Sequence, residues 1–308
     1  MSDAIDKTGN LAQAMEHAQQ LLDHDLQQAA LQLEEILAAV PDYVPAHFLK
    51  AVVLGQQQQG EQAIQALEKV LALDPNHPEA WRLLADHSAA IGDKAASESA
   101  YLRHLQSATG NPNLQQAAAA MIANELPTAE RILKSHLKNA PTDVAAIRML
   151  AEVAVRVGRN DDAQALLEYC LELTPGFAGA RYNLAVLLHR TNKSDDALRE
   201  VDQLLAEEPD RPGYRNLAAV VCSRIGEYER SSRLYQALLE EYPQNAKVWL
   251  SYAHVLKTEG KREACEAAYR GAIDRDARFG EAYWSLANLK TFRFSEQDIA
   301  SMQRQVAR

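Results

Sequence analysis

Aromatic residues make up only 6% of this 308-residue chain, while 47% of it is hydrophobic, mostly alanine and leucine. This composition favours closely packed helices over a β-sheet. Basic residues are also few, with 32 Lys+Arg against 42 Asp+Glu and a formal net charge of −10. Such a chain lacks the broad basic surface that nonspecific nucleic-acid binding needs. We therefore expect a helical protein that binds no nucleic acid.

Long apolar runs are missing as well, since none approaches the roughly 18 residues that span a bilayer. The first residues lack the charged-then-apolar pattern of a signal peptide. These absences predict a cytoplasmic protein without a membrane partner. Cys170, Cys222 and Cys265 lie far apart in sequence and show no CxxC spacing. We expect core positions for all three rather than a disulfide framework or a zinc site.

Motifs of catalysis and cofactor binding are absent from the sequence. Its 13 glycines form neither GxGxxG nor GxxxxGK[ST], and HExxH does not occur. The nine histidines are scattered, and no spacing pairs a Ser or Cys nucleophile with a base. We expect no catalytic residue, no metal and no cofactor in this chain.

Prolines recur at a constant spacing along most of the sequence. Pro41 is followed by Pro75, and steps of the same length connect Pro141, Pro175, Pro209 and Pro243. Ala277 holds the next position, and the gap of 66 between Pro75 and Pro141 is two residues short of two periods. A fixed period of about 34 residues indicates stacked copies of one supersecondary unit. The residue that begins each period is called the anchor below.

Each period contains two segments with apolar residues at helical spacing, separated by a polar or glycine break. Glycines occupy position 17 after four anchors, at Gly92, Gly158, Gly226 and Gly260. A left-handed C-cap explains glycine at this break. At position 10 after an anchor the side chain is small, as at Ala185, and at position 26 it is usually bulky, as at Tyr235. This alternation lets two helices approach closely while large residues fill the space between pairs.

The period and pattern resemble the tetratricopeptide repeat. Trp81…Leu84-Ala85, Tyr182-Asn183-Leu184-Ala185 and Trp249…Tyr252-Ala253 carry the resemblance best, and it covers essentially the whole chain. The resemblance implies an all-α, right-handed solenoid of about seventeen or eighteen antiparallel helices. We expect one solenoid over residues 1–308, with a terminal helix pair at 278–308 and no catalytic domain. Its eight repeats are expected at about 8–41, 42–75, 76–109, 110–141, 142–175, 176–209, 210–243 and 244–277.

The fourth repeat departs from the pattern. It begins with Gly110-Asn111-Pro112-Asn113, has four consecutive alanines in its first helix, and places Pro127 at the start of its second. We expect a kink or a change of superhelix pitch there.

Membership in this family would place extended peptides on the concave face, which the first helix of each repeat lines. That face corresponds to positions 7, 8, 11, 14 and 15 after each anchor. In repeats five to eight the candidate groove residues are Arg148, Arg156, Tyr182, Asn183, Arg190, Asn216, Arg224, His254 and Lys257, with Glu152 and His189 beside them. Asn183 stands where the family commonly uses asparagine to hold a peptide backbone, and the cations would favour carboxylates. An acidic or C-terminal peptide is the expected ligand, and a merely solvated, charged helix face is the alternative.

The last segment, Tyr283-Trp284-Ser285-Leu286-Ala287-Asn288-Leu289-Lys290-Thr291-Phe292-Arg293-Phe294-Ser295, has a second resemblance. It is similar to the junction in bacterial proteins that fuse tetratricopeptide repeats to a sulfotransferase domain using 3′-phosphoadenosine-5′-phosphosulfate. This likeness implies a recognition module whose sulfotransferase domain would follow residue 308. In physical terms the segment is a terminal helix pair with Ser295 as an N-cap.

A stand-alone scaffold or homo-oligomer stays open as the alternative. It would use the convex face or the ends of the solenoid, where Leu286, Phe292 and Phe294 would supply an apolar patch.

Overall fold

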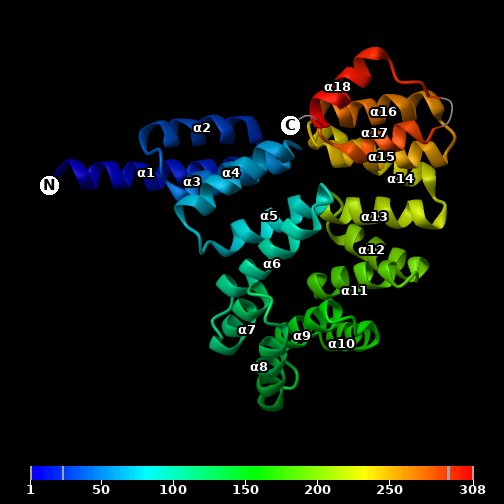
Figure 1. Cartoon of the computed structure of the whole chain (residues 1–308). Helices are drawn as coiled ribbons and strands as arrows, with labels where there is room; N and C mark the ends of the chain where they lie inside the picture. Colours follow the sequence, from blue (N-terminus) through cyan, green and yellow to red (C-terminus); the bar gives the residue numbers. More distant parts are fainter. Residues whose placement is uncertain (1, 23, 290–291, 307–308) are drawn as a thin grey trace. The chain divides into compact units, whose positions relative to one another are not determined.

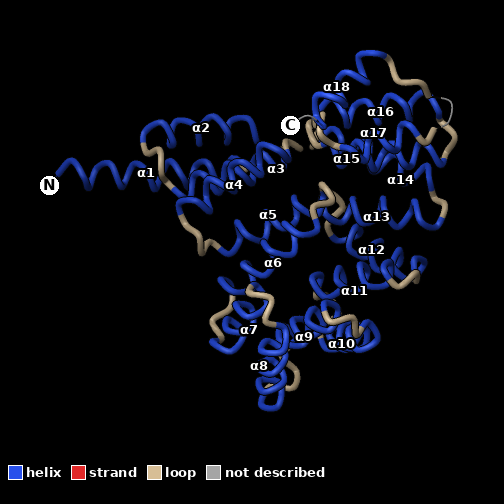
Figure 2. Tube along the Cα trace, viewed as in Figure 1, coloured by secondary structure: helices blue, strands red, loops and turns tan. Residues whose placement is uncertain are grey.

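The computed structural model describes residues 2–22, 24–289 and 292–306, and that part of the chain contains helices and no strand (Figures 1 and 2). Consecutive helices pack against each other in pairs, which confirms the predicted all-α architecture. The helices are α1 (Ser2–Leu21), α2 (Leu26–Ala39), α3 (Val44–Gln56), α4 (Gly60–Leu73), α5 (Pro78–Ala90), α6 (Lys94–Ala108), α7 (Pro112–Ile122), α8 (Leu126–Asn139), α9 (Val144–Arg156), α10 (Asn160–Leu173), α11 (Ala178–Arg190), α12 (Ser194–Glu207), α13 (Pro212–Ile225), α14 (Tyr228–Glu241), α15 (Ala246–Thr258), α16 (Arg262–Arg275), α17 (Gly280–Ala287) and α18 (Glu296–Val306).

The chain forms two compact units. The first comprises Met1–Ser88 and Lys94–His136, and the second comprises Ala89–Asp93 and Leu137–Arg308. Leu33 on α2 and Leu67 on α4, both fully buried, are centres of the packing in the first unit. In the second unit Leu167 and Leu187 belong to one buried cluster, and Tyr269 belongs to another. The predicted organisation as one solenoid of eight repeats stays a prediction.

A side-chain donor six residues after the anchor fastens the start of the first helix in most repeats. The indole N–H groups of Trp81 and Trp249 donate to the carbonyls of Pro75 and Pro243, at 2.8 and 2.9 Å. Other residue types do the same in other repeats: a nitrogen of His47 lies 2.7 Å from Pro41 O, Gln115 donates to Thr109 O at 2.8 Å, and Arg181 donates to Pro175 O at 2.6 Å. These bonds occupy a carbonyl that the end of the preceding helix leaves without an intrahelical partner.

The turn inside repeats two to eight uses one left-handed residue in each, as the glycine spacing predicts. Gly92, Gly158, Gly226 and Gly260 have φ between 72° and 94°. Three non-glycine residues adopt the same conformation, namely Gln58, Asn124 and Asn192, with φ of 58°, 58° and 61°. Asparagine tolerates this region better than most residues do, whereas glutamine has no such advantage.

Substitutions at this turn are expected to change stability in opposite directions. Gly158→Ala should lower the free energy of unfolding by about 1 kcal/mol, because a Cβ is disfavoured at positive φ. The added Cβ would meet no atom within 4 Å, so the loss would be conformational rather than steric. Gln58→Gly should raise stability by up to about 1 kcal/mol for the same reason. Urea unfolding followed by circular dichroism measures both, and equal shifts of the same sign would contradict this account.

The irregular fourth repeat is short in its first helix. α7 has 11 residues, whereas α3, α9, α11 and α15 each have 13. The two missing residues therefore account for the short spacing between Pro75 and Pro141. Asn111 caps α7 by accepting a hydrogen bond from the amide of Asn113 at 3.0 Å.

The three cysteines are core residues, which confirms the sequence interpretation. Cys170, Cys222 and Cys265 are at most 1% exposed and form no disulfide. Burial raises the pKa of each thiol to about 11. A thiol with such a pKa is protonated at neutral pH and is a poor nucleophile.

The C-terminal helix α18 is held by the N-cap that the sequence predicts. The amide of Asp298 donates to Ser295 Oγ at 3.2 Å, and the amide of Ser295 donates to Asp298 Oδ2 at 2.8 Å. Arg270 on α16 donates to both Asp298 oxygens, at 3.1 and 3.2 Å, and lowers the pKa of that carboxyl to about 2. α18 is thereby tied to α16.

The sequence predicts an apolar end patch made of Leu286, Phe292 and Phe294, and this choice of residues is wrong. Leu286 is 1% exposed, and Phe292 and Phe294 are half-buried against the core around Tyr269. The exposed large apolar residues near this end are instead Trp284 on α17, at 69%, and Ile299 on α18, at 45%. Lys290 and Thr291 of the same segment lie outside the described residues.

Candidate functional site

The candidate residues lie on the first helices of the repeats in the second unit, α9, α11, α13 and α15. α9 contacts α11, α11 contacts α13, and α15 follows them through its contact with α14, which packs on α13. Their residues at positions 7, 8, 11, 14 and 15 after each anchor are called the first-helix face below. Hydrogen bonds from one repeat to the next cross this face, as the following contacts show.

Three arginines occupy position 15 after successive anchors, where the first helices end. Arg156 is half-buried and pairs with Glu152 within α9 at 3.0 Å. Arg224 is exposed and donates to Asn192 Oδ1 of the preceding repeat at 2.7 Å. Arg190 is exposed and makes no hydrogen bond or ion pair with the described residues. Of the three cations, Arg190 is thus the most available to a ligand, and Arg224 the next.

Two further candidates present polar groups that nothing in the described chain engages. Asn183 on α11 is half-buried, and its side-chain amide has no hydrogen bond to a described residue. Lys257 on α15 is exposed and likewise has no ion pair within the described residues. An amide offers both donors and an acceptor to a peptide backbone, and an ammonium offers three donors to carboxylates.

Arg148 is not an exposed groove cation. Only 4% of it is accessible, and its guanidinium carbon lies 5.6 Å from the centre of the Phe177 ring. Burial lowers the pKa of Arg148 to about 10, so the group stays charged at neutral pH. A Cβ on Gly179 would lie 3.2 Å from the guanidinium, so the absence of a side chain there leaves room for it. The sequence pattern places Arg148 in the correct register, but the pattern carries no signal for this packing.

Aromatic and histidine candidates are engaged within the protein. The ring centres of Tyr182 and Tyr214 are 5.7 Å apart. His254 Nε2 lies 3.3 Å from Ser285 Oγ on α17. Partial burial lowers the pKa of His254, an effect that Lys257 strengthens and Glu281 opposes. The ring is therefore neutral at pH 7 and acts as a hydrogen-bonding group rather than as a further cation beside Lys257.

Asn216 lines a hollow of about 290 Å³ within the second unit. Its side-chain amide donates to the carbonyl of Ala89 at 2.8 Å, so it is already occupied. The remaining lining residues come mainly from α15 and the start of α17: Ile91, Gly92, Lys247, Val248, Leu250, Ser251, His254, Phe279 and Glu281.

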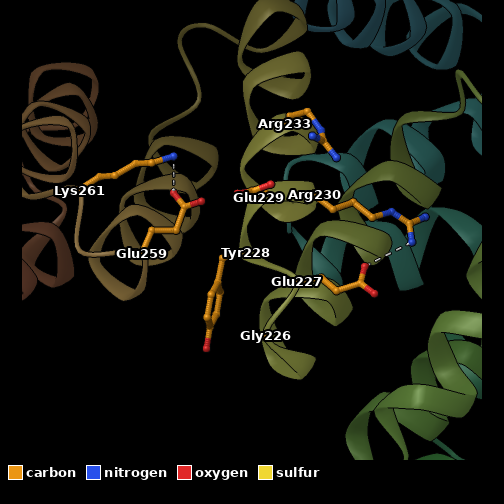
Figure 3. A pocket seen from close by; sticks show the side chains of 8 residues that line it. All are labelled: Gly226, Glu227, Tyr228, Glu229, Arg230, Arg233, Glu259 and Lys261. Carbon is orange, nitrogen blue, oxygen red and sulfur yellow. Dashed lines mark ion pairs between the residues drawn. The ribbon is translucent and has the colours of Figure 1, made fainter.

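A larger hollow of about 680 Å³ lies between the turns of the seventh and eighth repeats, away from the first-helix face (Figure 3). Arg230 pairs with Glu227 at 3.6 Å, and Lys261 pairs with Glu259 at 3.1 Å. Figure 3 shows the two pairs on opposite sides of the hollow, with Tyr228 between them. The lining holds three carboxylates and three cations in all, so the hollow has no net preference for an anion or a cation.

Metal binding and membrane insertion have no candidate elements in the described part of the chain. No group of three or more His, Cys, Asp or Glu is placed there to hold a metal ion. None of the described helices combines the length and apolarity needed to cross a bilayer.

Paired helices, a left-handed turn in each pair from α3–α4 to α15–α16 and a row of first helices together define an α-helical repeat protein. The tetratricopeptide repeat family model matches residues 20–86, 54–122 and 154–221, and a second model of the same repeat matches residues 246–279. The chain therefore belongs to the tetratricopeptide repeat family.

Solved structures with the same fold include YrrB, described as a TPR protein with an unusual peptide-binding site. It is 17% identical, has a TM-score of 0.51, and the match covers 57% of this chain and 91% of YrrB. MamA from Desulfovibrio magneticus RS-1 is 13% identical with a TM-score of 0.51, over 54% of this chain and 94% of that structure. No curated protein sequence matches the chain. At these identities the structural likeness bears on the fold alone.

Proposed function

We propose that the protein is a peptide-binding module whose first-helix face in the second unit takes an extended, acidic segment of a partner. The observation that carries this is the set of unengaged polar groups on one face: the Asn183 amide, the Arg190 guanidinium and the Lys257 ammonium. Arg224 adds a fourth polar group. One of its guanidinium nitrogens donates to Asn192, and the residue as a whole is exposed. Charged donors of this kind bind carboxylates more strongly than neutral donors do.

The family supports the class of function, and the charge distribution supports the choice of ligand. Residues 1–141 carry 9 Lys+Arg against 17 Asp+Glu, whereas residues 142–308 carry 23 against 25. The second half is therefore nearly neutral overall, and two of its unengaged cations, Arg190 and Lys257, lie on the first-helix face. YrrB, whose description names a peptide-binding site, is a relative in fold that favours the same class of ligand.

A salt titration tests this proposal. A fluorescein-labelled decapeptide of alternating glutamate and serine is compared with its lysine–serine counterpart by fluorescence anisotropy. We expect the acidic peptide to bind more tightly, and its affinity to fall as NaCl rises from 50 to 500 mM, because salt screens exposed charges. Equal binding of the two peptides, or binding that salt does not change, would contradict the acidic preference.

A more specific role is the recognition half of a bacterial sulfotransferase. This part of the proposal is supported only by the resemblance of residues 283–295 to the junction of such fusion proteins. Sequencing the gene beyond the codon of Arg308 tests it. A following strand, phosphate-binding loop and helix would support the role, and an immediate stop codon would exclude a fused catalytic domain.

The alternative is a stand-alone scaffold or an oligomerisation repeat protein. Analytical ultracentrifugation separates it from the peptide-binding module. The module predicts a constant sedimentation coefficient between 1 and 50 µM protein, whereas an oligomerising protein would show a rise over that range.

A further inference from the structure

Trp284 on α17 is the most exposed large hydrophobic side chain in the described part of the chain, at 69%. Its helix neighbours are fixed in the core, since Ala282, Ser285 and Leu286 are at most 3% exposed. A rigid helix therefore presents the indole to solvent. Burying an indole removes a large apolar area from contact with water. Tryptophan is therefore enriched among the residues that dominate binding interfaces.

The register of Trp284 places it at the end of the first-helix face. It stands seven residues after Ala277, the position that Asn216 and Leu250 hold after Pro209 and Pro243. Asn216 and Leu250 both line the hollow of the second unit. The contact of 3.3 Å between His254 Nε2 and Ser285 Oγ joins α17 to α15, the helix that carries Lys257.

The charges on this face differ from one end to the other. Arg190 and Arg224 are exposed on α11 and α13, whereas on α17 the exposed carboxylate of Glu281 lies beside the face, one turn before Trp284. An acidic ligand residue is attracted to the first of these ends and repelled from the second. An apolar ligand side chain has no such penalty beside Glu281 and gains contact with the indole.

We propose that Trp284 anchors one large apolar side chain of the acidic peptide that the first-helix face binds. The peptide lies with its carboxylates over α11 and α13 and with a leucine-like or aromatic residue over α17. This inference rests on the proposed function and adds the sequence class of the ligand: acidic residues on one side of a single bulky apolar residue.

Binding measurements with paired peptides test the anchor. The probes are labelled glutamate–serine decapeptides that carry one leucine, scanned through the ten positions, and the same peptides with alanine instead. We expect the best leucine peptide to bind the natural protein about tenfold more tightly than its alanine partner, as for a buried interface anchor. Trp284→Ala should abolish that difference. Tyr169→Ala is the matched control, since Tyr169 is an exposed aromatic residue, 40% accessible, on the second helix α10, and it should keep the difference.

Acrylamide quenching of tryptophan fluorescence gives an independent readout. Trp81 and Trp249 are half-buried and donate hydrogen bonds to backbone carbonyls, so Trp284 should account for most of the quenching. We expect saturating leucine peptide to lower the quenching constant of the natural protein and to leave that of Trp284→Phe nearly unchanged. Quenching that instead falls with rising protein concentration, without peptide, would show that a second copy covers Trp284 and would overturn the inference.

The outcomes separate this inference from the proposed function. If leucine and alanine peptides bind equally well and Trp284→Ala binds both as the natural protein does, the anchor is wrong and the acidic site stands. If the natural protein binds no acidic peptide at all, the proposed function is wrong, and the anchor falls with it.

Discussion

Glu241→Leu should lower the free energy of unfolding by about 3–5 kcal/mol, the range for removing one partner of a buried ion pair. Glu241 on α14 pairs with Arg215 on α13, and their side chains are only 5% and 8% exposed. Arg215 also donates to the carbonyl of Asp210 at 3.0 Å. Without the carboxylate, the guanidinium keeps that bond but remains as an uncompensated charge in the core. Chemical denaturation of the variant and of the natural protein measures the difference.

Two controls keep this result specific to the buried charge. The double variant Arg215→Met/Glu241→Leu removes both charges and should regain most of the lost stability, since apolar pairs often replace buried ion pairs without loss. Arg199→Ala breaks the pair with Asp196 on the surface of α12, where Arg199 is 71% exposed. Its effect should be below about 1 kcal/mol. A double variant as unstable as Glu241→Leu would show that the pair itself, rather than an unpaired charge, decides the stability.

Replacing Asn183 and Arg190 together with alanine should weaken binding of the acidic peptide by about 1–3 kcal/mol, the range for losing hydrogen bonds to charged groups. Both groups lie on α11 and lack partners in the described chain. Their removal should therefore leave the fold intact and act on the ligand alone. Anisotropy titration at low salt gives the affinity, and thermal unfolding checks that stability is unchanged.

Arg199→Ala is the matched control for this pair as well. Arg199 is an exposed arginine of the same repeat, but it lies on the second helix, α12. Its loss removes the same charge as Arg190→Ala and should leave affinity unchanged. Equal weakening by the two arginine substitutions would mean that net charge, and not the first-helix face, governs binding.

The sequence predicts features that depend on one residue type at one position. A left-handed turn requires a positive φ, for which glycine is the simplest solution, so Gly158 and its equivalents mark the turn inside their repeats. Gln58 adopts the same conformation, although the sequence has no glycine there to indicate it. Position and period together would have found it, because it occupies position 17 after Pro41.

Features that chemically different residues can supply are much harder to predict. The donor six residues after the anchor is tryptophan, histidine, glutamine or arginine, which share an N–H group and little else. The partners in the buried pair, Arg215 and Glu241, lie on different helices, and each alone is indistinguishable in sequence from a surface charge. Arg148 illustrates the same difficulty at the candidate site. Its register is that of the first-helix face, but Phe177 and Gly179 in the next repeat decide that it is buried.

Photo-crosslinking with the acidic peptide tests the central claim most directly. A glutamate–serine decapeptide with one benzophenone group is irradiated with the natural protein, and the attachment sites are mapped by mass spectrometry. Our account predicts attachment within the first helices of the second unit, α9, α11, α13, α15 and α17, and its loss on adding excess unlabelled acidic peptide. Attachment concentrated in α10, α12, α14 and α16, or spread over both sets and insensitive to competitor, would contradict a binding site on the first-helix face.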